Sequence, residues 1–338
     1  MNPPADSGPE LRRDPLSGEW VIVSPGRGYR PHSAAGPSPA QGSRGEQAAC
    51  PFCPGNESET PPALLTLPEA GSGEPWSVRV VPNRFPAVSP EGQGATGSEP
   101  LFRSKPARGF HEVIVETPRH DQEAPARRPA QVRLMIEAYR QRLAALMARP
   151  EIAYVVVFKN RGLAAGTSLD HPHSQVVALS QVPGEVRRRV QTARRHYRRT
   201  GRCLVCDLVA AERKDGRRLI FEADGFLAYA PFAAAAPYET LLVPLEHGAA
   251  LTAASPATER GLATSLQSLL RKLDRTLDVP PFNLILRTAP KPWLTDPALH
   301  WYAQLVPRLS RAAGFELGSG VRINMVAPEA AARRLAAG

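Results

Sequence analysis

The sequence predicts a fold of strands and helices in which one structural plan is used twice. Three observations support this prediction: the four cysteines form two Cys-x-x-Cys pairs, the same order of strand, helix and strand follows each pair, and each copy carries histidines at matched positions. His120 precedes His171 by 51 residues, and His247 precedes His300 by 53. Such agreement in order and spacing indicates an internal repeat.

The first copy begins at Cys50-Pro-Phe-Cys53. Residues 112–116 are rich in β-branched side chains, which predicts a strand. A helix is expected over 129–147, and the run Tyr-Val-Val-Val-Phe predicts a second strand at 154–158. An apolar run at 176–179, directly after a pair of histidines, predicts a third strand.

The second copy repeats this order after its own cysteine pair. Strands are expected at 239–243 and 282–286. The helix between them is predicted to have Ser255 as its N-cap and Pro256 at its first position, because a serine hydroxyl accepts from free helical N–H groups and proline has no N–H to satisfy. Residues 300–304 then match the histidine-containing segment of the first copy.

Two stretches rich in Pro, Ser, Ala and Gly, at 33–48 and 88–99, are expected to be mobile loops. Neither is expected to mark a domain boundary. The repeat instead predicts an N-terminal unit at residues 1–180 and a C-terminal unit at residues 181–338.

Composition limits the class of protein. The 42% hydrophobic and 22% charged residues are typical of a globular enzyme, the N-terminus lacks the features of a signal peptide, and no apolar run approaches a membrane span, so we expect a cytoplasmic protein without a membrane partner. The net charge of +10 is concentrated in arginines of a predicted helix at 185–202. Nucleic-acid binding is one interpretation, but aromatics make up only 6%, and a solvated helix face is favoured.

Each copy offers two cysteines and two histidines, the set that tetrahedral zinc requires. Either cysteine pair alone could be a redox pair, but two pairs in register with two histidines each favour metal, as does a reducing compartment. No ligand position is left open, so both sites are expected to be structural. The predicted ligands are Cys50, Cys53, His120 and His171 in the first copy and Cys203, Cys206, His247 and His300 in the second.

The two copies differ where chemistry is expected. Alignment on the last metal ligand of each copy pairs His173 with Tyr302 and Gln175 with Gln304, so only the first copy has a second histidine. In a strand, His173 shares a face with the residue two positions earlier. That neighbour can be fixed by metal while His173 presents a ring nitrogen to a substrate. A histidine nucleophile is therefore expected in the first copy, and the second is expected to be scaffold.

The chain resembles the galactose-1-phosphate uridylyltransferase family of the histidine-triad superfamily. The resemblance extends from about Arg13 to Ala331 and is carried by the entry segment Asp14–Pro31, the first cysteine pair, Asn83, Asn160 and His171-Pro-His-Ser-Gln175. It implies an α+β fold of two histidine-triad-like half-barrel repeats, each an antiparallel sheet with packed helices. It also implies a homodimer with active sites near the interface.

The resemblance implies a role for each matching residue in a ping-pong nucleotidyl transfer. His173 attacks the α-phosphorus of a nucleotide sugar and releases the sugar 1-phosphate, and Gln175 donates a hydrogen bond to an α-phosphate oxygen. The implied substrate-binding residues are Arg27 and Arg30 at a phosphate or the sugar, Asn83 and Asn160 at the nucleotide, Gly166 and Ser168 along the phosphate path, and Phe315 at the hexose.

The predicted function is a hexose-1-phosphate nucleotidylyltransferase of the UDP-glucose:galactose-1-phosphate uridylyltransferase type. An adenylyl-transferring ADP-glucose phosphorylase is the alternative, because the second predicted zinc site is similar to that branch and residues 314–320 lack the polar side chains with which the galactose enzymes bind the hexose. A non-catalytic zinc scaffold that binds nucleic acid is a more distant alternative, suggested by the pI of about 9.9. It leaves His173 unexplained.

Overall fold

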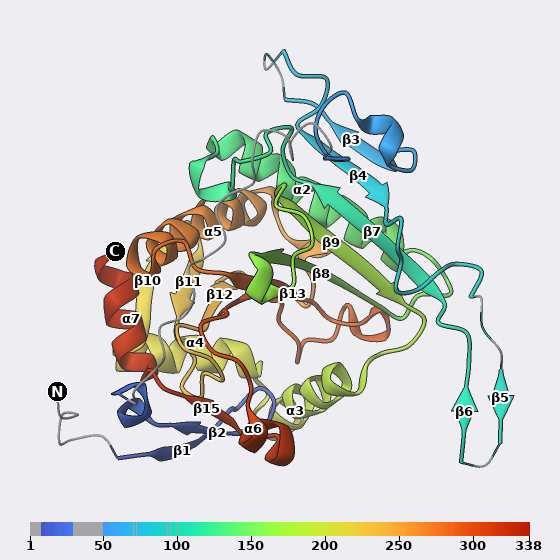
Figure 1. Ribbon diagram of the computed structural model, residues 1–338. Helices are drawn as coiled ribbons and strands as arrows, with labels where there is room; N and C mark the ends of the chain where they lie inside the picture. Colours follow the sequence, from blue (N-terminus) through green and yellow to red (C-terminus); the bar gives the residue numbers. More distant parts are fainter. Residues whose placement is uncertain are drawn as a thin grey trace.

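A ten-stranded sheet forms the centre of the computed structural model, which describes residues 8–29, 50–69, 71, 73–92, 94, 96–99 and 101–338 (Figure 1). One half of the sheet contains β8 (Tyr154–Arg161), β9 (His173–Leu179), β7 (Gly109–Val115), β4 (Val78–Pro82) and β3 (Leu65–Leu67), in that order. The other half contains β13 (Phe282–Arg287), β14 (Tyr302–Pro307), β12 (Thr240–Pro244), β11 (Phe226–Tyr229) and β10 (Leu219–Ala223). Every neighbouring pair is antiparallel.

The two halves are two copies of one strand order and meet at their β8 and β13 strands. Across this junction Asn160 pairs with Asn283, and Phe158 pairs with Ile285. The predicted repeat is therefore confirmed, and its copies join edge to edge in one continuous sheet. The predicted α+β class with antiparallel strands is also confirmed.

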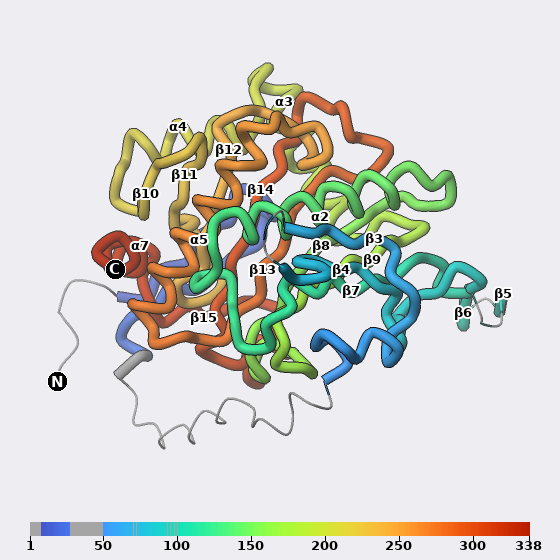
Figure 2. Tube along the Cα trace, turned by 90° about the horizontal axis from the view of Figure 1, so that it is seen from above, coloured from blue at the N-terminus to red at the C-terminus, as the bar shows by residue number. Residues whose placement is uncertain are grey.

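Three helices cover one face of the sheet: α2 (Pro129–Met147), α5 (Pro256–Leu277) and α7 (Pro328–Ala337). Figure 2 shows α2 and α5 side by side, and their apolar faces share one core with inward side chains from both halves of the sheet. The α2 helix has the predicted bounds. The α5 helix begins as predicted, because the Ser255 hydroxyl accepts from the Thr258 N–H at 3.2 Å.

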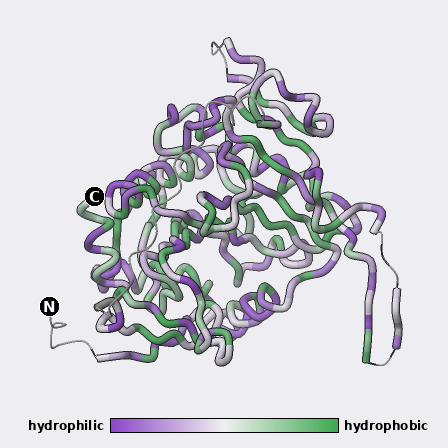
Figure 3. The backbone as a smooth tube through the Cα atoms, viewed as in Figure 1, coloured by the Kyte–Doolittle hydropathy of each residue, from purple (hydrophilic) through white to green (hydrophobic). Residues whose placement is uncertain are grey.

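The other face of the sheet is only partly covered. Helices α3 (Gly184–Thr200) and α4 (Leu204–Asp215) lie over the second half, and α4 packs its apolar side chains on β11, β12 and β14. The predicted helix at 185–202 is thus confirmed within two residues, and the hydropathy colours of Figure 3 show that most of its residues are hydrophilic. Among the described residues, the first half has no such helix. The segment that carries Cys50 and Phe52 covers Val113 and Val115 of β7, whereas the side chains farther along this face of β9 and β8, Gln175, Val177, Val156, Phe158 and Asn160, are only half-buried.

A small sheet joins the two ends of the described chain. It contains β1 (Glu10–Arg13), β2 (Trp20–Val23) and β15 (Arg322–Asn324), and the short helix α6 (Gly314–Ser319) precedes β15. A two-stranded hairpin of β5 (Gly97–Ser98) and β6 (Arg103–Ser104) projects from the first half. The predicted loop at 33–48 lies outside the described residues, as does Arg30. Among the helices of the described residues, none has the length and hydropathy needed to cross a membrane.

Candidate active site and metal centres

The first cysteine pair and two histidines meet on the open face of the first half. Cys50 and Cys53 lie in a turn closed by the Cys53 N–H and the Cys50 carbonyl, His120 follows β7, and His171 precedes β9. The Sγ of Cys53 lies 3.4 Å from Nδ1 of His120 and 3.6 Å from Nδ1 of His171. Tetrahedral zinc with ordinary bond lengths requires an S–N separation of about 3.6 Å. The four residues therefore fit a tetrahedral metal ion.

Hydrogen bonding orients His171 as a metal ligand. Its Nε2 lies 2.8 Å from the Thr117 carbonyl and donates to it, so Nδ1 carries the lone pair that faces the cysteines. Burial is the main factor that lowers the pKa of His171 to about 4, and the neutral form is the one that binds metal.

His173 has one ring nitrogen fixed and the other free to react. Its Nδ1 lies 2.8 Å from the carbonyl oxygen of His171, which only accepts, so Nδ1 carries the proton and Nε2 carries the lone pair. The side chain is only 6% exposed, and burial lowers its pKa, so the ring is neutral at neutral pH. A neutral imidazole in this tautomer can act as a nucleophile without a separate base.

Three side-chain amides on the same face are oriented alike. In each, a protein group contacts the oxygen: the Phe85 N–H bonds Asn83 Oδ1 at 2.9 Å, Asn283 Nδ2 bonds Asn160 Oδ1 at 2.8 Å, and His111 Nε2 lies 2.8 Å from Gln175 Oε1. Within the described residues, no acceptor bonds the amide nitrogens of Asn160 and Gln175. The arrangement directs N–H donors toward the space in front of the sheet, where an anion can accept them.

The turn after β8 completes this side of the site. Gly166 has a φ of +89°, which only glycine adopts without strain, and a Cβ there would lie 3.8 Å from Asn160 Nδ2. Gly166 and Ser168 are both exposed. The structure thus places Gly166 beside Asn160.

Arg27 and Phe315 lie elsewhere. Arg27 is part of a short 3₁₀ helix, Pro25–Tyr29, that follows β2. The pKa of Glu316 in α6 is lowered mainly by backbone N–H groups and also by the nearby Arg27 guanidinium. Phe315 is 49% exposed on the same helix. In Figure 1, β2 and α6 lie at the lower edge of the molecule, apart from β9, the strand that begins at His173.

The second cysteine pair forms a matching cluster. The Sγ of Cys206 lies 3.4 Å from Nδ1 of His247 and 3.5 Å from Nδ1 of His300, and Cys203 is the N-cap of α4. The ligand atoms of each cluster lie within 4.8 Å of one another, so this set also fits a metal ion. His300 differs from its counterpart, because its Nε2 is buried without a hydrogen-bond partner in the described part of the chain.

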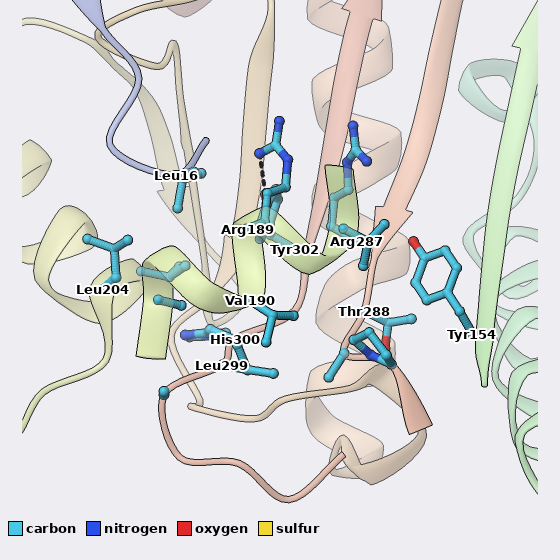
Figure 4. A pocket seen from close by; sticks show the side chains of 16 residues that line it. Leu16, Tyr154, Arg189, Val190, Leu204, Arg287, Thr288, Leu299, His300 and Tyr302 are labelled. Atoms are coloured by element: carbon cyan, nitrogen blue, oxygen red, sulfur yellow. Dashed lines mark hydrogen bonds between the residues drawn. The ribbon is translucent and has the colours of Figure 1, made fainter. Parts of the chain in front are cut away.

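The second copy keeps the matched positions but uses them differently. Gln304 has both ends of its amide occupied: Arg287 Nε donates to Oε1 at 2.8 Å, and Nε2 donates to Glu239 at 2.6 Å. The Tyr302 hydroxyl accepts from Arg189 at 3.3 Å, beside a cavity of about 580 Å³, which includes space open to solvent, between α3 and the second half of the sheet (Figure 4). This copy therefore presents neither a nucleophilic histidine nor a free amide donor at the matched positions.

Two features of the first copy are absent from the sequence-based prediction. His111 contacts Gln175, and a buried ionic network lies on the helix side of the sheet directly behind the nucleophile's strand. In this network Glu116 bonds Lys159 and Arg127, each at 3.0 Å, and accepts from the hydroxyl of Ser174. The charged residue directly after the apolar run 154–158 was the available signal for Lys159; no spacing rule pointed to His111.

Two family models match nearly the whole chain. The galactose-1-phosphate uridyl transferase N-terminal domain matches residues 4–183, and the C-terminal domain of the same family matches residues 189–332. The chain belongs to the galactose-1-phosphate uridylyltransferase family. The predicted enzyme class, a nucleotidyltransferase, is thereby confirmed.

Named relatives represent two activities. The chain is 35% identical over 329 residues to the ADP-glucose phosphorylase of Arabidopsis thaliana, covering 96% of this chain and 92% of that protein. It is 30% identical to the galactose-1-phosphate uridylyltransferase of Thermotoga maritima, covering 96% and 97%. A crystal structure of the Arabidopsis phosphorylase with bound ADP-glucose superimposes with a TM-score of 0.83 at 33% identity, covering 97% of this chain and 99% of that one.

Proposed function

We propose that the protein is a hexose-1-phosphate nucleotidylyltransferase that works through a covalent nucleotidyl-His173 intermediate, with a UDP-hexose as donor and a hexose 1-phosphate as acceptor. One observation carries this proposal: a buried, neutral histidine with Nδ1 bonded to a carbonyl presents Nε2 on the face where side-chain amides direct their N–H groups. Nucleotidyl transfer needs a nucleophile and fixed donors for phosphate oxygens.

In the first half-reaction, Nε2 of His173 attacks the α-phosphorus and forms an N–P bond. The bond from that phosphorus to the bridging oxygen breaks, and the hexose 1-phosphate leaves with the electron pair. The ring gains positive charge, which the hydrogen bond from Nδ1 to the His171 carbonyl stabilises. In the second half-reaction, a phosphate oxygen of the acceptor attacks the same phosphorus and releases the neutral histidine.

The amides act on the phosphate during both steps. Gln175 lies two residues from the nucleophile on β9 and donates to an α-phosphate oxygen as negative charge moves onto it. Asn83 and Asn160 bind the nucleotide, and the backbone at Gly166 and Ser168 borders the path of the phosphates. Charge stabilisation of this kind is the main requirement of phosphoryl transfer.

We further propose that zinc occupies both Cys₂His₂ sites and that both ions are structural. All four ligands of each site are protein side chains, and Cys₂His₂ is a common structural zinc set. When bound, the zinc ion would hold the Cys50 loop, the segment after β7 and the start of β9 together. The His171 carbonyl then fixes the orientation of the His173 ring through the hydrogen bond from Nδ1.

A second candidate function is the phosphorolysis of ADP-glucose, with inorganic phosphate as the acceptor. The higher identity to the Arabidopsis phosphorylase favours it. The short α6 helix also favours it, because Gly314–Ser319 offers few side chains that could bind particular hexose hydroxyls.

Two labelled donors separate these functions. The purified protein is incubated with UDP-glucose or with ADP-glucose, each labelled in the α-phosphate, and acid-labile label on the protein is measured. Galactose 1-phosphate or inorganic phosphate is then added to discharge it. We expect label from UDP-glucose that galactose 1-phosphate removes. Label only from ADP-glucose, removed by phosphate, supports the second candidate, and no label from either donor contradicts both.

We propose a homodimer in which the partner subunit supplies Arg27 and Phe315 to each site. The separation of α6 and β2 from β9 within one chain supports this arrangement (Figure 1). Mixing His173→Gly and Arg27→Ala chains tests it, because a mixed dimer contains one site with both native residues. Random mixing of equal amounts makes about half of the dimers mixed, so about one quarter of the wild-type activity should be recovered. Mixed dimers without activity would contradict a shared site.

The remaining expectations fit this proposal. The N-terminal unit at residues 1–180 carries the catalytic residues and the unit at 181–338 serves as scaffold. All four cysteines are free in the structure, in keeping with a cytoplasmic enzyme whose thiols bind metal. We propose no nucleic-acid or membrane partner.

A further inference from the structure

His111 lies on the ligand-facing side of β7, next to the strand that carries His173. Val113 pairs with Gln175 and His111 pairs with Val177, so the ring of His111 reaches back along the sheet to the amide of Gln175. Its Nε2 lies 2.8 Å from Gln175 Oε1. No other described residue hydrogen-bonds the Gln175 side chain.

The backbone decides which nitrogen of His111 carries the proton. The Ala87 N–H, which can only donate, bonds Nδ1 at 3.1 Å. Nδ1 is therefore an acceptor, and the neutral ring carries its proton on Nε2. Nε2 then donates to the oxygen of Gln175, which leaves the Gln175 nitrogen and both its hydrogens directed away from the ring.

Asn83 also lies against the ring but does not decide the tautomer, which rests on the Ala87 N–H and the Gln175 oxygen. The Asn83 oxygen accepts from the Phe85 N–H at 2.9 Å, so its nitrogen is the atom that lies 3.1 Å from His111 Nε2. Two groups that both carry hydrogens do not bond each other, so the Asn83 N–H groups stay available for a ligand. The His111 ring thus lies between the side-chain amides of Asn83 and Gln175, and the N–H groups of both amides remain available to a ligand in front of the sheet.

The second copy provides an internal comparison. Leu241 pairs with Gln304 as Val113 pairs with Gln175, so Glu239 occupies the position that matches His111. There the carboxylate accepts from the Gln304 nitrogen at 2.6 Å, and the amide presents its other end to Arg287. Glu239 is an acceptor and therefore bonds the nitrogen of the Gln304 amide, whereas His111 is a donor and bonds the oxygen of the Gln175 amide.

We propose that His111 is a positioning residue that fixes the Gln175 amide with its nitrogen toward the α-phosphate, an inference that rests on the proposed function. His111 does not touch the reacting atoms. It removes the alternative orientation, in which the Gln175 oxygen would face the phosphate and repel it. The difference between His111 and Glu239 is then one reason why only the first copy supports nucleotidyl transfer.

Three substitutions at position 111 test the proposal by single-turnover formation of the nucleotidyl-enzyme. His111→Leu removes the donor, His111→Glu reproduces the second copy, and His111→Gln restores an N–H near the position of Nε2. We expect the Leu and Glu variants to slow the step by about 10- to 100-fold, less than the roughly 10²- to 10³-fold loss for deletion of a transition-state donor, with little change in KM. The Gln variant should recover most of the rate.

A double-mutant cycle separates positioning from general structural damage. If His111 acts through Gln175, then His111→Leu has little further effect in a Gln175→Ala background. A loss as large in that background as in the wild type would overturn the proposal, as would a His111→Leu enzyme with the wild-type rate. His196→Leu is the matched control, since it removes another partly buried histidine, bonded to Asp207 at 2.7 Å on the second half.

A measurement on the resting protein keeps the inference separate from catalysis. The ¹⁵N shifts of the His111 ring report which nitrogen is protonated, whether or not the protein turns over. We expect a protonated Nε2 and an unprotonated Nδ1, and the opposite tautomer would contradict the proposal. If the wild type forms no nucleotidyl-enzyme while the tautomer is as expected, the proposed function fails and the assigned orientation does not.

Discussion

The Nδ1 of His173 donates to the backbone carbonyl of His171 across 2.8 Å, and this contact links the nucleophile to a metal-binding cluster. His171 is itself held by the cysteines on one side and by the Thr117 carbonyl on the other. Any change that lets His171 move therefore changes both the tautomer of His173 and the direction in which its Nε2 points. The second cluster has no such link, because Tyr302 replaces the nucleophile.

Matched cysteine substitutions should separate the two clusters. Cys50→Ser and Cys203→Ser each remove one ligand from a closed site, and closed zinc sites contribute on the order of 10 kcal/mol apparent to folding. We expect both variants to lose one zinc ion of two and to melt at lower temperature, but only Cys50→Ser should also lower kcat of the folded fraction. Elemental analysis and melting curves check this. Equal effects on kcat would show that the link through His171 has no catalytic role.

His173→Gly should abolish turnover and leave the fold intact, because His173 binds no metal and its removal leaves the His171 contacts in place. Circular dichroism and zinc content should match the wild type. Added imidazole should restore part of the first half-reaction by entering the vacated space. An active His173→Gly protein would rule out the proposed nucleophile.

Tyr302→His should not create a second active site. The matching glutamine, Gln304, already bonds Arg287 and Glu239, so it offers no donor to a phosphate. The test is the amount of label per chain in the variant that combines His173→Gly with Tyr302→His, which should stay at background. Stoichiometric label at position 302 of that variant would contradict this interpretation of the second copy.

Glu116→Gln should destabilise the protein and reduce its acid sensitivity. Burial alone would raise the pKa of Glu116, but Lys159 and Arg127 outweigh burial and hold it at about 2, below its ordinary value of 4.5. The network therefore stabilises the fold above pH 4.5, and this contribution is lost as the pH falls toward 2. Removal of the charge should cost about 3–5 kcal/mol near neutral pH.

Denaturant unfolding at several pH values measures this effect. The difference in stability between wild type and Glu116→Gln should shrink as the pH falls below 4.5. A difference that stays constant down to pH 2 would mean that the ion pairs contribute nothing beyond packing.

Discrimination between hexose acceptors should be shallow. The α6 helix carries Phe315, and apart from Glu316, whose carboxylate already accepts from the Ala313 N–H, its other residues are small or exposed. We therefore expect the helix to recognise the shape of a hexose rather than a particular hydroxyl. Shape alone gives roughly 10- to 200-fold selectivity, whereas a specific hydroxyl contact reaches roughly 10⁴-fold. We expect glucose 1-phosphate and galactose 1-phosphate to differ by less than about 100-fold in kcat/KM. A preference near 10⁴-fold would indicate a specific hydroxyl contact outside this helix.

Repetition made much of the fold predictable. The helix at 129–147 and the Ser255 cap follow from local patterns, and the structure confirms both. The two sets of cysteines and histidines follow from the repeat, and the structure brings each set together as a group that could hold a metal ion. The strands β1, β2 and β15 were not predicted, because each is only three or four residues long and pairs with a segment that local patterns do not identify.

The orientation of the site residues could not be predicted from sequence. Val113 lies seven residues before His120, whereas its counterpart Leu241 lies six residues before His247. An alignment of the two copies on these histidines therefore misses by one residue the first-copy position that corresponds to Glu239. A shift of one residue in a strand moves a side chain to the opposite face. Only the pairing register of the strands identifies His111 as the first-copy counterpart of Glu239.

The mass of the intact protein after incubation with a nucleotide sugar tests the central claim most directly. We predict that UDP-glucose, without an acceptor, adds one uridylyl group per chain, that peptide mapping places it on His173, and that a hexose 1-phosphate removes it. Sugar nucleotide turnover without any covalent adduct, or an adduct on a residue other than His173, would contradict the proposed mechanism.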